Sequence, residues 1–393
     1  MGDGGASFLS ETVGAGEISI TLVGPVHPLG GGVAQHVATL ADELVHGNLH
    51  SITVESWKSQ YPRFLHRSQV TIEDASQELP LSVPVARKLA WYSPLSWVMA
   101  GLRNRNRDAV LFNVVTPFHA VPFGLMALFL GRATLKVAIV HNALPHERTP
   151  LDRTLLRLLV SVCDAHVVHD GESERLLRQL TGERKQVVSV PLPDPWRFPI
   201  SLPPSSDVLS KKVEPPAVSA LFFGNVRPYK GLNVLLEALR DIPKVSLTVA
   251  GNFWNQQASI ALKVQECGLT DRVFLAPGYV PKDEIPRLFS RADVVVLPYV
   301  SGTASVIPQI ALSQGKPVIA TDVGSIAVDI RHGVNGFVVK ANDSRALARA
   351  LSVLAENPEL RDKLTWGALQ SKLDNRWAQY IAVLRKLIDD SRK

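Results

Sequence analysis

The chain has 393 residues, of which 46% are hydrophobic and 20% charged, which excludes a disordered protein and favours two globular domains over one. Its net charge of +6 favours an anionic partner, such as a nucleotide diphosphate, a lipid headgroup or a nucleic acid, without choosing among them. The two cysteines, Cys163 and Cys267, lie far apart and indicate neither a disulfide framework nor a metal site, so we expect a cytoplasmic protein.

Neither a signal peptide nor a membrane-spanning helix is expected. Residues 1–17 carry acids and glycines in place of a basic segment followed by an apolar one. The longest apolar stretch, residues 120–131, contains a proline and falls short of the ~20 residues that a span requires. Any contact with the inner face of the cell membrane is therefore expected to be peripheral.

A glycine loop follows the first predicted strand, Ile18–Val23, and precedes an amphipathic helix at residues 33–45. Gly31 and Gly32 would let the backbone approach a phosphate or a sugar closely. A dinucleotide site is disfavoured, because Gln35 stands where the third glycine of that motif is required. A loop that binds no ligand is the other interpretation.

Short β-branched runs alternate with helical patterns along the rest of the chain, which is typical of parallel sheets covered by helices on both faces. In the first half the further strands are predicted at Ser51–Glu55, Ala109–Phe112, Leu135–Val140, Ala165–His169 and Gln186–Val190. In the second half they are predicted at Ala220–Phe223, Ser246–Ala250, Val273–Leu275, Val294–Leu297, Pro317–Ala320 and Gly336–Val338. Other helices are predicted at Leu232–Leu239, Glu284–Phe289 and Arg376–Ile388.

Eight prolines between Pro191 and Pro216 indicate a semi-rigid linker between two doubly wound, Rossmann-like domains that face a central cleft. The predicted boundaries are residues 1–195 for the first domain, 196–216 for the linker and 217–372 for the second domain. Residues 373–393 are predicted to form a helix that packs back towards the first domain.

A basic and aromatic segment lies at Arg87–Trp97 and is followed by Arg103, Arg105 and Arg107. Cations beside interfacial aromatic residues are typical of a peripheral membrane surface, which would bring the protein to a lipid-linked acceptor. A buried pair of helices with a solvated basic loop explains the same residues, and both interpretations stay open.

His141 directly follows the strand predicted at Leu135–Val140. Two interpretations stay open for His141: a functional residue in the cleft, or a residue with only a structural role. The spacing of His141 and His146, with the adjacent Glu147, could suggest a metal site. The neighbouring prolines prevent a helix from presenting both imidazoles, so we expect no metal.

A cationic turn leads from a strand through Gly224 to Arg227 and Lys230, and Gly231 then opens a helix. Arginine offers a bidentate fork and lysine a point charge, both beside the positive end of a helix, which suits a diphosphate. The other interpretation is a solvated turn with two surface cations.

This turn resembles the diphosphate-binding turn of the group 1 (family 4) retaining glycosyltransferases. Three later segments are similar to that family's segments in order and spacing, Gly278–Pro281, Ala292–Tyr299 and Gly315–Gly324. The resemblance covers about residues 217–340 and implies a GT-B fold.

The resemblance also implies roles for particular residues. Arg227 and Lys230 would neutralise the leaving diphosphate, and His141 would contact the donor sugar. The residues that would contact the rest of the donor are Gly31, Gly32, Gly224, Tyr279, Val280, Thr303, Ser305, Val306 and Gln309.

The sequence departs from the family at a pair of glutamates, whose places are taken by Gly302 and Ile310. It resembles a branch with a Thr/Ser-rich loop, in which the backbone amides of Ser305 and Val306 receive diphosphate oxygens. Gln309 is interpreted either as a ligand of the ribose hydroxyls or as a helix-surface amide.

The function expected from the resemblance is transfer of a hexosyl unit from a UDP- or GDP-sugar to an acceptor hydroxyl, with retention and without metal or cofactor. The acceptor would be a glycan, a lipid-linked molecule or a small molecule, as in carbohydrate biosynthesis. Nucleic acid is disfavoured because the cations form no stripe with stacking aromatic residues. The alternatives are a non-catalytic nucleotide- or sugar-binding partner protein and a nucleotide-sugar epimerase or hydrolase on the same scaffold.

Overall fold

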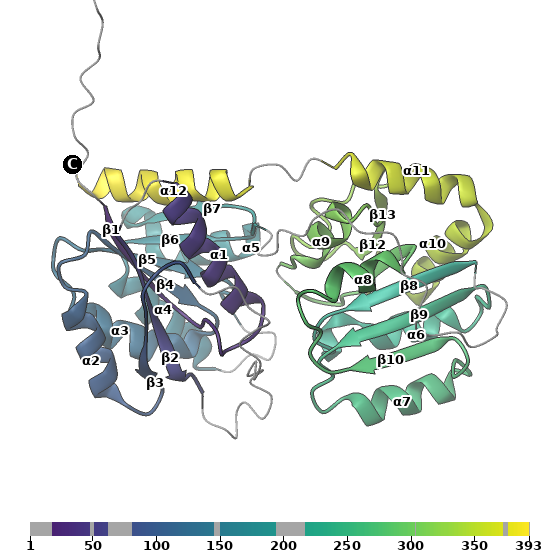
Figure 1. The fold of residues 1–393 in the computed structure, drawn as a ribbon, viewed down its shortest axis with the longest axis horizontal. Helices are drawn as coiled ribbons and strands as arrows, with labels where there is room; N and C mark the ends of the chain where they lie inside the picture. The colour runs from purple at the N-terminus through teal and green to yellow at the C-terminus, as the bar shows by residue number, and fades with distance from the viewer. Residues whose placement is uncertain are drawn as a thin grey trace, which may run out of the picture.

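The computed structural model describes residues 18–47, 51–61, 81–144, 150–193, 217–302, 304–371 and 376–392. Two parallel sheets stand side by side along the long axis of the molecule, each with its own helices (Figure 1). The expected linker at 196–216 lies outside the described residues, as do His146 and Glu147.

Within the described residues the first sheet has seven parallel strands in the order β3-β2-β1-β4-β5-β6-β7. The strands are β1 (Ser19–Val23), β2 (Ser51–Ser59), β3 (Val85–Ala90), β4 (Ala109–Val114), β5 (Leu135–Val140), β6 (Ala165–Val168) and β7 (Gln186–Ser189). The helices are α1 (Gly32–His46), α2 (Pro94–Arg103), α3 (Ala120–Leu128), α4 (Asp152–Val162) and α5 (Gly171–Thr181), with short 3-10 turns η2 (Pro117–His119) and η3 (Gly182–Arg184).

The second sheet has, in the described part of the chain, six parallel strands in the order β10-β9-β8-β11-β12-β13. The strands are β8 (Val218–Phe223), β9 (Val245–Gly251), β10 (Val273–Pro277), β11 (Val294–Leu297), β12 (Val318–Thr321) and β13 (Gly336–Val339). The helices are α6 (Leu232–Leu239), α7 (Gln257–Glu266), α8 (Ile285–Ser290), α9 (Ile307–Ser313), α10 (Ser344–Glu356) and α11 (Pro358–Leu369), with the 3-10 turn η4 (Pro228–Lys230).

Both faces of the first sheet are buried, which explains the continuous apolar runs in its strands. On β4, Leu111 belongs to the core under α1, whereas Val110 and Phe112 belong to the core under α2, α3 and α4. The described residues therefore show the doubly wound arrangement that strand and helix alternation predicts.

The last helix, α12 (Arg376–Ser391), returns from the second domain and lies against the first, beside α1 (Figure 1). Trp377, Tyr380 and Leu384 are buried in the same core cluster as the apolar face of α1. Arg376 forms an ion pair with Asp329 of the second domain. The helix thus contacts both domains.

The structure corrects the interpretation of Arg87–Trp97 as part of a buried helix pair. Residues 85–90 form the edge strand β3, and only residues 94–103 are helical. Arg87 and Lys88 are exposed on that strand. Charged residues protect a sheet edge from pairing, and they also hide the two-residue alternation of a strand.

Candidate functional site

The second sheet reverses its strand order between β8 and β11. In open parallel sheets, ligands bind outside the carboxyl ends of the strands at such a switch point. The segments that follow these strands, residues 224–231 and 298–302, meet there. Figure 1 shows that β8, β9 and β10 point towards the first domain.

The cationic turn after β8 is held in place by its own backbone. Gly224 has a positive φ of 109°, and its N–H donates to the carbonyl of Ala250 over 2.9 Å. Gly231 is left-handed, with φ 68°. A Cβ at Gly231 would lie 1.9 Å from the carbonyl oxygen of Pro298, so the close approach of the two loops requires glycine there.

The loop after β11 holds the other side of the turn. The backbone N–H groups of Val300 and Ser301 donate to the carbonyl of Tyr229, over 2.8 and 3.3 Å. The Lys230 Nζ lies 5.1 Å from the centre of the Tyr299 ring. A Cβ on Gly224 would lie 3.2 Å from the same Nζ. The ammonium therefore lies between the end of β8 and Tyr299.

Both cations of the turn have an aromatic partner. Lys230 is only 9% exposed. Burial lowers the pKa of its ammonium, but Tyr299 and Tyr229 outweigh this effect, so the pKa is raised and the group stays charged. The guanidinium carbon of Arg227 lies 3.5 Å from the centre of the Trp254 ring, a cation–π contact. Two positive charges three positions apart thus lie at the switch point.

The described part of the Thr/Ser-rich loop lies beside Tyr299. The hydroxyl of Ser305 lies 3.4 Å from the Tyr299 Oη and accepts from the N–H of Ile307, over 3.3 Å. Val306 directly precedes α9. Thr303 lies outside the described residues. The contacts predicted from Ser305 and Val306 to a diphosphate stay predictions.

Gln309 is 3% exposed, so its interpretation as a helix-surface amide is wrong. Its Nε2 donates to the carbonyl of Leu192 over 2.8 Å, which joins α9 to the end of the first domain. The Oε1 has no hydrogen-bond partner among the described residues. The ribose contact stays a prediction. Ile310, at the place of the second family glutamate, is completely buried in the core of the second domain.

Tyr279 and Val280 follow β10 at the same edge of the sheet. Gly278, with φ 132°, donates its N–H to the carbonyl of Gly251 over 2.9 Å, which continues the pairing past β10. Tyr279 is 42% exposed and is accessible to a ligand. Its contact with a base stays a prediction.

The glycine loop of the first domain follows β1, at the switch point between β1 and β4. Gly31 has φ 112°, and a Cβ on Gly31 or Gly32 would meet no atom within 4 Å. Both glycines are exposed. The open surroundings fit a close approach of a ligand, and the contact itself stays a prediction.

His141 belongs to a cluster of three buried histidines, together with His36 and His169. Its ring centre lies 4.8 Å from that of His36 and 5.1 Å from that of His169. Its Nε2 lies 3.3 Å from the Asn113 Oδ1. From α12, Trp377 stacks on His36 with ring centres 5.3 Å apart. Sequence reasoning missed this cluster, because the residues come from α1, from the positions just after β5 and β6, and from α12.

Burial sets the protonation of these histidines. It lowers the pKa of His36 and that of His141 well below the ordinary value, and the neighbouring imidazoles lower both further. Burial also lowers the pKa of His169, to about 4. At neutral pH the cluster is therefore uncharged, and His141 is suited to hydrogen bonding and not to binding an anion by charge.

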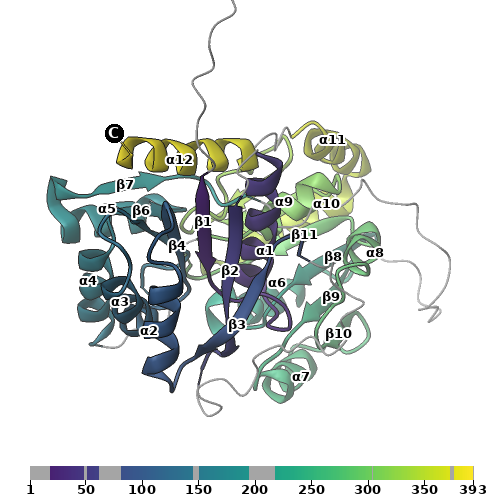
Figure 2. The same ribbon diagram turned by 60° about the vertical axis from the view of Figure 1, so that its left-hand side comes forward.

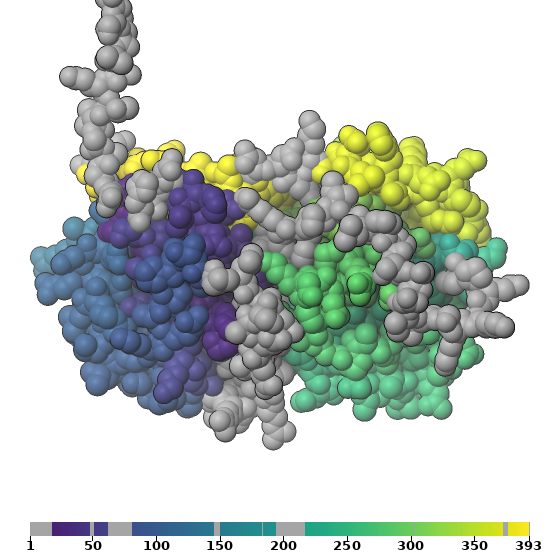
Figure 3. Space-filling view, viewed as in Figure 1, coloured from purple at the N-terminus to yellow at the C-terminus, as the bar shows by residue number. Residues whose placement is uncertain are grey.

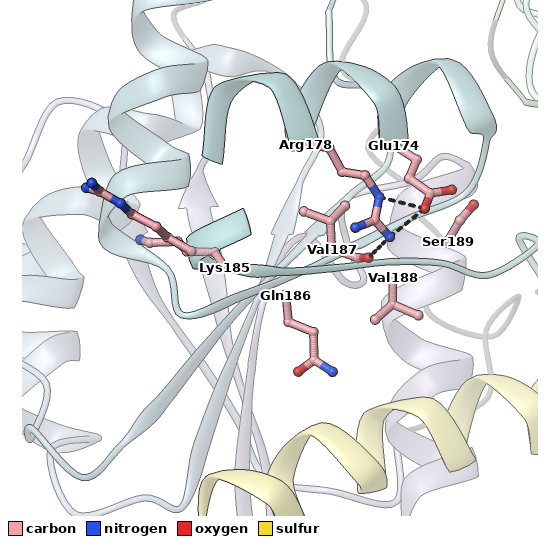
Figure 4. A pocket seen from close by; sticks show the side chains of 8 residues that line it. Glu174, Arg178, Lys185, Gln186, Val187, Val188 and Ser189 are labelled. Atoms are coloured by element: carbon pink, nitrogen blue, oxygen red, sulfur yellow. Dashed lines mark hydrogen bonds and ion pairs between the residues drawn. The ribbon is translucent and has the colours of Figure 1, made fainter. Parts of the chain in front are cut away.

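A wide recess of about 780 Å³ lies on the first domain between α5 and β7 (Figure 4). Arg178, on its wall, donates to Glu174 and to the carbonyl of Val187, over 2.8 Å each. None of the predicted site residues lines this recess. We therefore place the candidate site at the switch points and not here.

Two doubly wound parallel sheets, one in each domain, are arranged as in the GT-B fold. Sucrose-phosphate synthase from Thermosynechococcus elongatus superposes with a TM-score of 0.71 at 18% identity, covering 95% of this chain and 100% of that one. HepE from Anabaena, in complex with UDP, gives a TM-score of 0.69 at 17% identity, covering 94% and 100%.

Residues 210–370 match the family described as "Glycosyl transferases group 1". Over these residues the second domain is similar to the group 1 glycosyltransferases. This match includes Arg227, Lys230 and the loop after β11.

Curated relatives carry the name D-inositol 3-phosphate glycosyltransferase. The one from Mycobacterium marinum (strain ATCC BAA-535 / M) is 27% identical over 200 residues, which is 47% of this chain and 42% of that protein. The one from Mycobacterium avium (strain 104) is 30% identical over 203 residues, covering 48% and 47%. The match thus spans less than half the length of these relatives.

Proposed function

We propose that this protein is a glycosyltransferase that transfers a hexosyl unit from a UDP- or GDP-sugar to an acceptor hydroxyl, with retention at the anomeric carbon. The observation that carries the proposal is the turn of Arg227 and Lys230, which the loop after β11 holds at the switch point of the second domain. Solved structures of HepE contain UDP and UDP-glucose, which favours UDP as the nucleotide.

The proposed chemistry depends on charge at the leaving group. The departing nucleotide diphosphate gains negative charge in the transition state, so cations placed beside it lower the barrier. Arg227 and Lys230 would supply that charge without a metal. His141 would hydrogen-bond the donor sugar, and the loops at Gly31 and Ser305 would offer backbone amides. Retention would follow from attack on the face that the phosphate leaves.

A titration of the full chain with UDP and with GDP, followed by calorimetry, tests the donor site. We expect one of the two nucleotides to bind with a Kd below about 1 mM, and we expect UDP to bind more tightly. The matched measurement uses the corresponding monophosphate, which lacks the second phosphate and should bind at least tenfold more weakly. Absence of binding for both diphosphates would contradict the proposal.

The second candidate is a nucleotide-binding partner protein without catalytic activity. The observation in its favour is that Gly302 and Ile310 occupy the places of the family's glutamates and that Ile310 is buried in the core. Product analysis separates the candidates. A transferase forms a glycosylated acceptor, a hydrolase releases free sugar, and an epimerase changes the sugar nucleotide. A binding protein leaves the sugar nucleotide unchanged.

A further inference from the structure

One side of the first domain exposes an unusual number of large apolar side chains. Of the 19 exposed large hydrophobic residues among the described ones, ten lie between Tyr92 and Leu158. They are Tyr92, Leu95, Met99, Leu102, Phe118, Val121, Leu128, Phe129, Leu151 and Leu158. All lie on or beside α2, α3 and α4, which pack side by side as one layer (Figure 2).

These side chains are on the outer surface of the layer, because each helix buries its other side. On α2, Leu95 is 70% exposed, whereas Trp97 is 6% exposed and bonds to the carbonyl of Ala90. On α3, Leu128 is 73% exposed, whereas Phe123 is buried in the core. The sheet is therefore already covered, and the outer side chains have no role in its core.

Two arginines lie beside the most exposed part of this layer. Helices α2 and α3 approach so closely that a Cβ on Gly101 would lie 2.5 Å from the carbonyl oxygen of Met126. The carbonyl of Arg105, just after α2, accepts from the N–H of Gly131, just after α3, over 3.1 Å. Arg105 and Arg132 thus lie on neighbouring loops next to the ends of both helices, and both are exposed.

The charge of this part of the chain is concentrated and positive. Residues 81–163 contain ten Lys or Arg and three Asp or Glu, a difference of +7, whereas the whole chain has +6. On α4, Arg153 and Arg157 are exposed beside Leu158. Figure 3 shows this part of the chain, in blue, on the side of the first domain that faces away from the second.

We propose that the outer surface of α2 and α3, with Leu95, Met99, Leu102, Leu128 and Phe129 flanked by Arg105 and Arg132, docks on an anionic lipid bilayer. The apolar side chains enter the boundary between headgroups and acyl chains, and the arginines pair with lipid phosphates. No helix of the described residues is long and apolar enough to span a bilayer, so the contact is peripheral. This inference does not depend on the proposed transferase activity.

A soluble protein partner would also cover an apolar surface, but the charge favours the bilayer. Residues 81–163 carry an excess of seven positive charges, and an anionic leaflet attracts clustered cations with about 1 kcal/mol for each one. Docking through α2 and α3, on the side of the first domain that faces away from the second, also keeps the second domain away from the membrane. Both switch points then stay accessible to a soluble donor.

Sedimentation of the full chain with vesicles tests the proposal. Vesicles of phosphatidylglycerol and phosphatidylcholine should bind the protein, and vesicles of phosphatidylcholine alone should bind it at least tenfold more weakly. The double variant Arg105→Gln/Arg132→Gln should bind the anionic vesicles about thirtyfold more weakly. The double variant Leu95→Asn/Leu128→Asn should lose most of the binding that resists high salt.

Matched control variants lie on the second domain, where exposed residues of the same types occur. Arg345→Gln/Arg349→Gln on α10 and Leu262→Asn on α7 should bind vesicles as the unchanged protein does. All variants change exposed side chains and should keep the same thermal midpoint. Equal binding to neutral and anionic vesicles, no binding to either, or equal losses in the controls would overturn the proposal. A dimer in solution that only the α2 and α3 variants break would also overturn it.

Discussion

Replacing Lys230 by methionine should lower the turnover of the donor sugar by about a hundredfold to a thousandfold. Methionine keeps an unbranched apolar stem in a place that is only 9% exposed, so the variant should fold. It removes the charge that lies between Gly224 and Tyr299 and that would stabilise the leaving diphosphate. Because that charge acts most in the transition state, kcat should fall more than the affinity for the donor.

The matched control for this prediction is Lys316→Met. The Lys316 Nζ donates to the carbonyl of Ser290 over 3.1 Å. The residue lies just before β12, at the amino ends of the strands, whereas the candidate site lies at their carboxyl ends. This variant loses a half-buried ammonium in the same domain without touching the candidate site. Its kcat should stay within about twofold of the unchanged protein. Full turnover in Lys230→Met would show that the turn was assigned wrongly.

Acid should unfold the first domain at a pH where the second is still folded. The pKa of His166 and that of His169 are lowered to about 4 by burial, and the pKa values of His36 and His141 are also lowered by burial. In the unfolded chain all four would take up protons near pH 6.5. The stability is therefore complete above pH 6.5 and is lost as the pH falls towards 4. Each proton adds about 1.4 kcal/mol per pH unit to this loss.

Chemical unfolding at a series of pH values checks this prediction, with the fluorescence of tryptophan as the probe because Trp377 stacks on His36. The variant His36→Phe should reduce the pH slope by about one proton. Both ring nitrogens of His36 lack a hydrogen-bond partner among the described residues, so phenylalanine should cost little at neutral pH. His46→Gln, an exposed position on the same helix, is the control. An unchanged slope in His36→Phe would contradict the assignment of the loss to this cluster.

The strands and the cationic turn could be predicted from the sequence because their information is local. Leu135–Val140 and Val294–Leu297 are continuous apolar runs, and such runs occur where a parallel strand is buried on both faces. The turn of Arg227 and Lys230 could be placed at the end of a strand because Gly224 and Gly231 mark the two changes of backbone direction.

Only the tertiary structure decided which distant residues meet. Lys230 lies against Tyr299 because β8 and β11 are neighbours, although 68 positions separate the two residues in the numbering. From the sequence, Gln309 was interpreted either as a ligand of the ribose hydroxyls or as a surface amide, yet it is buried and bonds to Leu192 of the other domain. His36, His141 and His169 each appear as single residues in the sequence, and their protonation depends on burial under α12.

The physical reason for this division is the range of the forces. Backbone geometry and the alternation of apolar residues act within one element and can be seen in its residues. Burial, hydrogen bonding between elements and the pKa of a histidine depend on the packing of elements that are far apart in the chain. The sequence by itself determined the two doubly wound domains and the cationic turn, and the packing decided what surrounds Lys230, Gln309 and His141.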